Sequence, residues 1–308
     1  MKRREFLKNA GFLAAASMTA GLRGTLLAAQ RRRPSPAVWP DLVGVKGGSP
    51  RQMIDAGLQA LGGMGRFVKK GRTVLVKPNI GWSKTPNEAA TTNPELVGRI
   101  VESARLAGAK KVFVFDHTVS NEEECYRLSG IRDAVKAAGG VMRSGEDHKA
   151  YRKASAPGWK VLKDVEVHEL YLDCDVVINV PVLKSHGGAR MTAAMKNLMG
   201  VVWDRQFWHR NGLHESIAEF PLIRKPDLNI VDAFIIMRKN GPRGLGTEDL
   251  LLKKMQILST DIVLADAASA KTLGVPLDDA PYLKMAQMLG LGSTVIEGKS
   301  VKRISLPA

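Results

Sequence analysis

Short apolar runs alternate with amphipathic stretches along most of the chain. The apolar runs predict strands at residues 38–45, 73–76, 111–115, 175–180, 228–236 and 301–305. The run at 111–115 is almost continuously apolar, as expected for a strand that is buried on both faces of a parallel sheet. Helices with one apolar face are predicted at residues 131–138, 191–201, 262–273 and 281–289.

Two further helices have recognisable starts. Ser49-Pro50 and Asn93-Pro94 each place a capping side chain directly before a proline, which is typical of a helix N-terminus. Strands and helices that alternate in this way predict an α/β fold, with a mostly parallel sheet and helices on both of its faces. A more polar and irregular stretch near residues 143–170 predicts an insertion into that fold.

The first thirty residues are typical of an export signal. Arg3-Arg4 is followed by Glu5-Phe6-Leu7-Lys8 and by a moderately apolar run, which matches the twin-arginine pattern. The run is too short for a transmembrane helix, and the alternative is a basic amphipathic helix. We expect residues 1–30 to engage the twin-arginine export machinery and to direct the chain to the periplasm or cell envelope, tethered to the membrane if the signal is not cleaved. Residues 31–37 are then a linker, and residues 38–308 a single α/β domain.

The composition is globular, with an excess of positive charge. Of 308 residues, 46 are basic and 30 are acidic, so the formal net charge is +16. Such a balance attracts anions. Pairs of basic residues are dispersed without interleaved aromatics, so nucleic-acid binding is not expected. Two cysteines are too few for an iron–sulfur cluster. Outside the cytoplasm, Cys125 and Cys174 would either pair or remain buried thiols.

Polar side chains gather where the predicted strands end, which is the edge at which α/β sheets bind ligands. After the strand at 73–76, Lys77 offers charge, while Asn79, Thr91 and Thr92 offer directional hydrogen bonds. These four residues are candidate substrate-binding groups. The alternative is a solvated turn followed by a helix cap.

A second polar segment follows the strand at 175–180. It places Lys184 and His186 before Gly187 and Gly188. Glycines let the backbone approach a ligand closely, and the start of the next predicted helix would present free N–H groups to an anion.

Further candidate binding groups follow the same strand and a later one. Thr192 and Lys196 are four residues apart and would share one face of the predicted helix, next to Asn197. Asn240 and Gly241 begin an Asn-Gly-Pro-Arg-Gly loop that resembles an anion-binding nest and also an ordinary exposed turn. A scattered surface distribution of these residues is the alternative.

Two carboxylates are candidate ligands for a divalent metal. Asp116 precedes His117 at a predicted strand end, where such a pair binds metal, transfers protons or caps the next element. Asp232 lies within an apolar strand and needs a partner, a cation or a metal, because burying an isolated charge is costly.

Seven short motifs occur in order along the chain. They are Val76-Lys77-Pro78-Asn79, Thr91-Thr92-Asn93-Pro94-Glu95, Leu183-Lys184-Ser185-His186, Lys196-Asn197-Leu198-Met199-Gly200, Ile230-Val231-Asp232, Asn240-Gly241-Pro242 and Asp261-Ile262-Val263-Leu264-Ala265-Asp266. In combination they resemble the family known as domain of unknown function 362, over approximately residues 40–308. The resemblance implies a catalytic-looking α/β domain without naming a reaction. Many members carry a cysteine-rich ferredoxin-type module, which this chain lacks, so the resemblance implies no cluster here. The matched motif positions are Lys77, Asn79, Lys184, His186, Lys196, Asn197 and Asp232.

These observations favour an exported enzyme that binds a small anionic substrate, either a carboxylate or a phosphate. Lys184, Lys196 and the backbone of Gly187-Gly188 would hold the negative charge. His186 would transfer a proton, because the pKa of histidine lies nearest neutral pH. The alternative is a non-catalytic protein of the cell envelope that binds a ligand or delivers a cofactor.

Overall fold

The structure is a computed structural model that describes residues 38–307. The predicted export signal at residues 1–30 and the predicted linker at 31–37 lie outside this range. None of the helices within residues 38–307 combines the length and the apolar character needed to cross a membrane.

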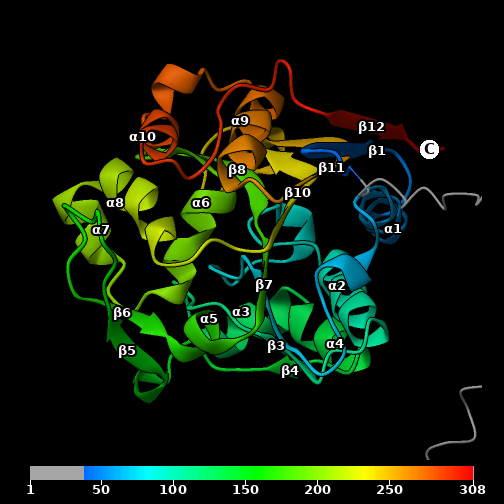
Figure 1. Ribbon diagram of the computed structural model, residues 1–308, viewed down its shortest axis with the longest axis horizontal. Helices are drawn as coiled ribbons and strands as arrows, with labels where there is room; N and C mark the ends of the chain where they lie inside the picture. The colour runs from blue at the N-terminus through cyan, green and yellow to red at the C-terminus, as the bar shows by residue number, and fades with distance from the viewer. Residues whose placement is uncertain (1–37, 308) are drawn as a thin grey trace, which may run out of the picture. The chain divides into compact units, whose positions relative to one another are not determined.

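Within the described residues, a mixed ten-stranded sheet runs through the domain (Figure 1). Eight of its strands follow one another from edge to edge: β12 (Val301–Ser305), β1 (Leu42–Lys46), β11 (Leu250–Ser259), β10 (Leu228–Met237), β7 (Val176–Val180), β2 (Thr73–Pro78), β3 (Lys111–Val114) and β4 (Val141–Met142). The other two lie off this path: β8 (Val182–His186) pairs with β10, and β9 (Arg190–Thr192) pairs with β8. Neighbours from β10 to β4 are parallel, as are β12 and β1, whereas β11 is antiparallel to both of its neighbours. The predicted α/β fold with a mostly parallel sheet is confirmed.

Helices lie on both sides of the sheet. One side carries α1 (Pro50–Ala60), α2 (Pro94–Leu106), α3 (Glu122–Leu128) and α4 (Ile131–Ala137). The other carries α5 (Glu169–Asp173), α6 (Ala194–Asn197), α8 (Leu213–Glu219), α9 (Ile262–Leu273) and α10 (Tyr282–Met288). Because successive strand residues point to opposite faces, Val43 contributes to one core and Leu42 to the other.

Cys125 and Cys174 belong to different cores. Cys125 lies in α3, and Cys174 follows α5 on the other side of the sheet. Both are free, buried thiols. Of the two alternatives for these cysteines, the structure therefore has buried thiols and no disulfide between them.

The two proline-containing helix starts are formed as predicted. The Ser49 hydroxyl accepts a hydrogen bond from the Gln52 N–H at the start of α1. The Asn93 side chain accepts hydrogen bonds from the Glu95 and Leu96 N–H groups at the start of α2. These side chains satisfy backbone donors that have no partner within the helix.

Two of the differences from the sequence prediction concern strands. Residues 191–201 do not form one helix, because β9 (Arg190–Thr192) pairs antiparallel with β8 (Val182–His186) before the four-residue helix α6 begins. A 3₁₀ turn at Leu198–Val201 follows. Strand β11 was not predicted, since Lys253-Lys254 interrupts its apolar pattern.

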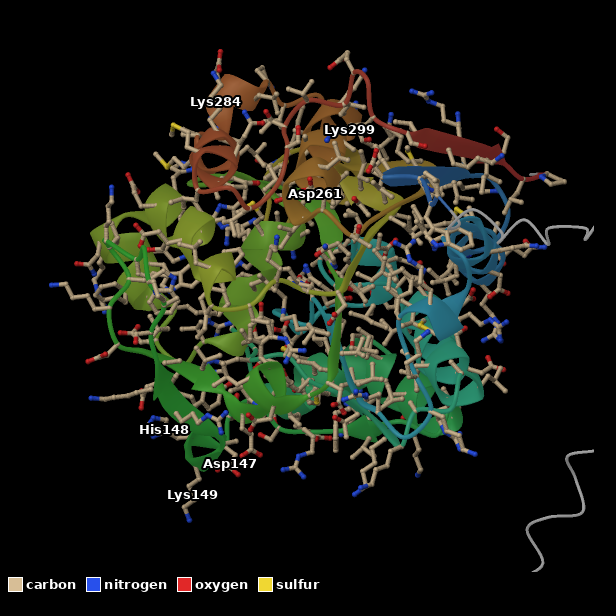
Figure 2. All side chains as sticks on the ribbon, in the orientation of Figure 1. Asp147, His148, Lys149, Asp261, Lys284 and Lys299 are labelled. Carbon is tan, nitrogen blue, oxygen red and sulfur yellow. The ribbon has the colours of Figure 1, made fainter. Side chains whose placement is uncertain are left out.

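The insertion predicted near residues 143–170 contains a separate antiparallel pair, β5 (Tyr151–Ala154) and β6 (Val165–His168). The turn before β5, with Asp147 and His148, lies at the periphery of the molecule (Figure 2). The His148 ring contacts Trp203, with ring centroids 4.4 Å apart, so the insertion supports a residue that lines the cavity described next.

Candidate functional site

A proline break directs the chain into the candidate site. Strand β7 pairs with the start of β10, and Pro181, which has no N–H group to donate, separates β7 from β8. Strand β8 continues along the second half of β10 and so carries Lys184 and His186 beyond the carboxyl end of β7. These two residues lie on a strand, whereas the sequence analysis placed them in a polar segment after the strand at 175–180.

A cavity of about 410 Å³ lies beyond these strand ends, within the size range of small-molecule sites. We call it the cationic pocket, because its basic lining residues are Lys184, His186, Lys196, Arg205 and His209. The rest of its lining is Asn79, Gly81, Trp82, Val119, Thr192, Asn197, Met199, Gly200, Trp203, Asp204, Gln206 and Pro242.

Lys184 is almost fully buried, with 1% of its surface exposed. Its amine donates hydrogen bonds to the Asn79 Oδ1, at 2.8 Å, and to the Ala90 carbonyl, at 2.5 Å. Both acceptors are uncharged. Burial, followed by the positive charge of Lys196, lowers the pKa of Lys184 to about 7. The amine therefore gains and loses its proton near neutral pH.

Lys196 is partly exposed to the cationic pocket. Within the described residues, the hydrogen-bond partner of its amine is the Met199 sulfur, at 3.3 Å. Burial lowers the pKa of Lys196 to about 7, and the nearby charges of Arg205 and Lys77 act in the same direction. The pocket thus holds two amines that titrate near neutral pH.

His186 and His209 stack against each other, with ring centroids 6.2 Å apart. The Nδ1 of His186 accepts a hydrogen bond from the Ala189 N–H, which leaves the ring proton on Nε2. Burial and the charge of Lys196 lower the pKa of His186 to about 3. His186 is therefore neutral at pH 7, contrary to the expectation that it would exchange protons there.

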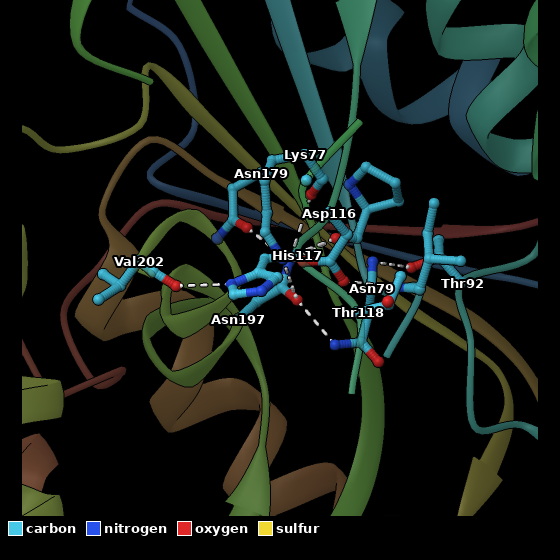
Figure 3. Close-up of polar contacts among 12 residues, drawn as sticks. Lys77, Asn79, Thr92, Asp116, His117, Thr118, Asn179, Asn197 and Val202 are labelled. Carbon is cyan, nitrogen blue, oxygen red and sulfur yellow. Dashed lines mark hydrogen bonds and ion pairs between the residues drawn. The ribbon is translucent and has the colours of Figure 1, made fainter. Parts of the chain in front are cut away.

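A chain of side-chain amides connects the pocket to the core (Figure 3). The Nδ2 of Asn79 donates to the Asn197 Oδ1, at 3.0 Å, and the Nδ2 of Asn197 donates to the Asn179 Oδ1, at 2.9 Å. Asn179 in turn donates to Asn229, at 3.0 Å. The chain fixes the orientation of the Asn79 amide, so that its oxygen faces Lys184.

Lys77 lies beneath the pocket rather than in its wall. Its amine lies 2.7 Å from the Asp116 Oδ1 and donates to the Asn197 Oδ1, at 3.1 Å. The other Asp116 oxygen accepts from the Ile80 N–H, at 2.6 Å. Burial lowers the pKa of Lys77, and Asp116 opposes this effect. A Cβ atom at Gly200 would lie 1.8 Å from the Asp116 Oδ1, so glycine is required for this buried ion pair.

The start of α6 is already occupied by an acidic side chain of the protein. The Asp266 carboxylate accepts hydrogen bonds from the Ala194 N–H, at 2.5 Å, and from the Met195 N–H, at 3.1 Å. The predicted use of this helix start for a bound anion is therefore wrong. Thr192 lies on β9 and does not share a helix face with Lys196, although both line the pocket.

Besides Lys77, four predicted binding residues of the segments at 91–92 and 187–188 lie outside the pocket lining. The buried Thr92 hydroxyl accepts from the Asn79 N–H and donates to the Val180 carbonyl, which gives it a structural role. Thr91 is buried, and Gly187 and Gly188 are exposed at the turn between β8 and β9.

The predicted Asn240–Gly241 segment also lies outside the lining, beside Ser185. Asn240 donates from its Nδ2 to the Asp249 carboxylate, at 2.7 Å. The Gly241 N–H donates to the Ser185 hydroxyl, at 3.0 Å, and a Cβ atom at Gly241 would lie 1.8 Å from the Ser185 carbonyl. This close approach explains the glycine and positions Pro242 in the pocket wall.

The two candidate metal ligands have other partners. Asp116 pairs with Lys77, and Asp232 accepts from the Asn93 and Phe234 N–H groups, at 2.7 and 3.1 Å. Burial raises the pKa of Asp232 to about 6. Within residues 38–307, no three His, Cys, Asp or Glu side chains are grouped so as to hold a metal ion. A metal site at Asp116 and Asp232, as expected from the sequence, would need additional ligands, and the described residues do not provide them there.

Sequence reasoning missed four residues of the pocket wall: Trp82, Trp203, Arg205 and His209. Arg205 donates from its guanidinium to two backbone carbonyls, those of His117 and Thr118. Three of the four fall within residues 203–209, which contain two of the five tryptophans of the chain. This concentration of tryptophans was the feature of the sequence that could have pointed to the segment.

Comparisons with known proteins support a family. The family model described as Domain of unknown function (DUF362) matches residues 74–271. Thylakoid-associated protein sll1697 from Synechocystis sp. is 29% identical over 263 residues, which cover 78% of this chain and 75% of that protein.

Two solved structures are similar to most of this chain. The lactate racemase apoprotein from Thermoanaerobacterium thermosaccharolyticum aligns with 75% of the chain, at 10% identity and a TM-score of 0.47. A protein from Thermotoga maritima aligns with 74%, at 13% identity and a TM-score of 0.45. The chain spans 56% and 60% of the lengths of these two proteins.

Proposed function

We propose that this chain, which belongs to the DUF362 family, is an enzyme that binds a small anionic substrate, a carboxylate or a phosphate, in the cationic pocket. One observation carries the proposal. The amines of Lys184 and Lys196 converge on one cavity with Arg205, and no carboxylate within residues 38–307 forms an ion pair with any of the three. Buried like charges repel one another, and a bound anion would relieve that repulsion.

Anion binding in this pocket would be coupled to proton uptake. An opposite charge within a few ångströms raises the pKa of an amine. Lys184 and Lys196, each with a pKa of about 7, would become fully protonated when the anion binds. The same charge would raise the pKa of His186 from about 3.

The two amines are also suited to proton transfer. A general acid or base works best when its pKa lies near the working pH. Lys184 and Lys196 meet that condition in the free protein, whereas His186 is neutral there and presents a fixed Nε2–H donor. In this proposal the lysines exchange protons with the substrate and His186 orients it.

Isothermal titration with acetate, oxalate and inorganic phosphate tests the binding step. We expect Lys196→Gln to weaken binding of a responding anion at least tenfold, because this amine has the fewest other contacts. Lys184→Gln should do the same. Lys110→Gln removes an exposed lysine far from the pocket lining and is the matched control. Equal binding by all four proteins would refute the proposed site.

The pH dependence of binding is a second test. Between pH 6 and 8, an amine with a pKa of about 7 falls from about 90% to about 10% protonated. Because the bound anion requires the protonated form, its affinity should fall about tenfold for each amine over this range. Oxalate is a suitable probe, since it keeps its own charge throughout. A flat profile would contradict the coupling.

The alternative is a non-catalytic ligand-binding or cofactor-delivery protein. The pocket lining favours this alternative, because it offers few nucleophiles: Thr192 provides its sole side-chain hydroxyl, and no cysteine is present. Incubation of a stabilising anion with the protein in D₂O, followed by NMR, separates the two functions. Deuterium incorporation or a new product supports the enzyme, and an unchanged ligand supports binding alone.

We also propose that the chain is exported by the twin-arginine route and acts in the periplasm or cell envelope. The proposal is supported by Arg3-Arg4 and the apolar run that follows, and the relative from Synechocystis sp. is named for its association with thylakoids. In cell fractionation, replacement of both arginines by lysine should retain the chain in the cytoplasm. Unchanged distribution would refute this route.

A further inference from the structure

A groove of about 440 Å³ lies on one face of the three strands at an edge of the sheet. Strands β12, β1 and β11 are neighbours there, and α9 lies beside them (Figure 1). The groove shares no lining residue with the cationic pocket.

The floor of the groove is apolar because of the alternation of side chains along the strands. In β1, Val43 and Val45 point into the core beneath α1, whereas Leu42 and Gly44 face the groove. In β11, Met255 and Ile257 face the same way. The floor could thus accept an aliphatic chain.

The charged residues that line the groove are all basic. They are Lys46, Lys253, Lys271 and Arg303. No aspartate or glutamate lines the groove, and none of the four forms an ion pair with another residue of the described range. An apolar floor with an exclusively positive rim complements a molecule that has an aliphatic tail and an anionic head.

Gly44 is an independent sign that a ligand approaches the strand closely. It lies in the middle of β1, where glycine lowers strand stability. A Cβ atom at this position would meet the Met255 Cε at 3.7 Å, an ordinary contact. Packing within the fold therefore does not require glycine, whereas a ligand lying on the strand would.

We propose that this groove binds a single-chain anionic amphiphile, with the aliphatic tail over Gly44 and Met255 and the anionic head beside Lys253 and Arg303. The chain's own N-terminal residues are a poor match for the groove, because Arg31, Arg32 and Arg33 carry the same charge as its rim. The proposal does not depend on the function of the cationic pocket.

Titration with laurate, below its micelle-forming concentration, tests the proposal by calorimetry. We expect laurate to bind and dodecyltrimethylammonium, which has the same tail and a cationic head, to bind at least tenfold more weakly. Equal binding of the two amphiphiles would overturn the proposal, because the basic rim would then have no role.

Two variants and a matched control locate the site. Gly44→Leu places a side chain in the groove and should abolish laurate binding, while Lys253→Glu combined with Arg303→Glu should weaken it at least tenfold. Lys302→Glu, on the opposite face of β12, combined with Lys110→Glu makes the same change of charge outside the groove and should leave binding unchanged. Circular dichroism melting confirms that each variant is folded, and the charge variant decides the test if Gly44→Leu is not.

Three results would contradict the inference. The first is laurate binding that all groove variants retain. The second is loss of laurate binding in Lys196→Gln but not in Gly44→Leu, which would place laurate in the cationic pocket. The third is sedimentation with phosphatidylglycerol vesicles without any binding of monomeric laurate, which would indicate docking to a bilayer surface.

Discussion

Replacement of Lys184 by methionine tests whether this buried amine titrates near neutral pH. Methionine has a similar length and no charge. The variant loses the hydrogen bonds to Asn79 and Ala90, so its absolute stability combines several effects. The change of its stability with pH, relative to the wild type, isolates the ionisation of Lys184.

The size of the effect follows from two pKa values of Lys184. The pKa is about 7 in the folded protein and about 10.4 in an unfolded chain. At a pH between these two pKa values, the unfolded state binds more protons than the folded state. The contribution of Lys184 to the free energy of unfolding therefore rises with pH. By this linkage, the amine destabilises the folded state by about 4 kcal/mol at pH 7 and by about 2 kcal/mol at pH 9.

Urea unfolding at pH 7 and at pH 9 measures the effect. The free energy of unfolding of the wild type, minus that of Lys184→Met, should increase by about 2 kcal/mol between the two pH values. Lys110→Met, which removes an exposed lysine, should follow the wild type at both. A constant difference between wild type and Lys184→Met would refute the lowered pKa, and with it the proton-coupled anion binding.

The remaining predictions concern the groups beneath the pocket, and urea unfolding measures each of them. Gly200→Ala should lower stability by about 2 kcal/mol or more, because its methyl group collides with Asp116 and Lys77, whereas Gly65→Ala, with no atom near its Cβ, should be nearly neutral. Asp116→Asn should cost about 3–5 kcal/mol by leaving Lys77 buried without its partner, and adding Lys77→Met should restore part of that loss. Burial raises the pKa of Asp266 to about 7, so the folded state binds more protons between about pH 4 and 7. Acidification across that range should therefore stabilise the wild type relative to Asp266→Asn. If the difference between their free energies of unfolding does not change with pH, the raised pKa of Asp266 is contradicted.

The regular elements were largely predictable, because apolar periodicity is a local property. The helix predicted at 262–273 corresponds to α9, and the strand predicted at 301–305 corresponds to β12. The prediction failed at 191–201, where helical spacing of apolar residues was overridden by pairing with β8. Strand pairing joins residues that are not neighbours in the sequence, so the local spacing of apolar residues does not reveal it.

Part of the pocket lining was also predictable from the sequence. Lys184, His186, Lys196, Asn79 and Asn197 lie on or shortly after strands β2, β8 and β9, and all five line one cavity. Since parallel strands end at the same edge of a sheet, their following residues converge. For His209, on a helix away from the sheet edge, the sequence offered only the concentration of tryptophans at residues 203–209.

Sequence alone determined the α/β class, the helix starts and the chemical types of side chain gathered at the strand ends. Only the tertiary structure decided what each of those side chains does. Lys77 lies on β2 and Lys184 on β8, yet Lys77 pairs with Asp116 and Lys184 meets neutral acceptors. Likewise, Asp266 takes up the N–H groups at the start of α6 that the sequence left for a ligand. The reason is that burial and charge pairing depend on residues far apart along the chain, and these two effects set the charge and the pKa of a side chain.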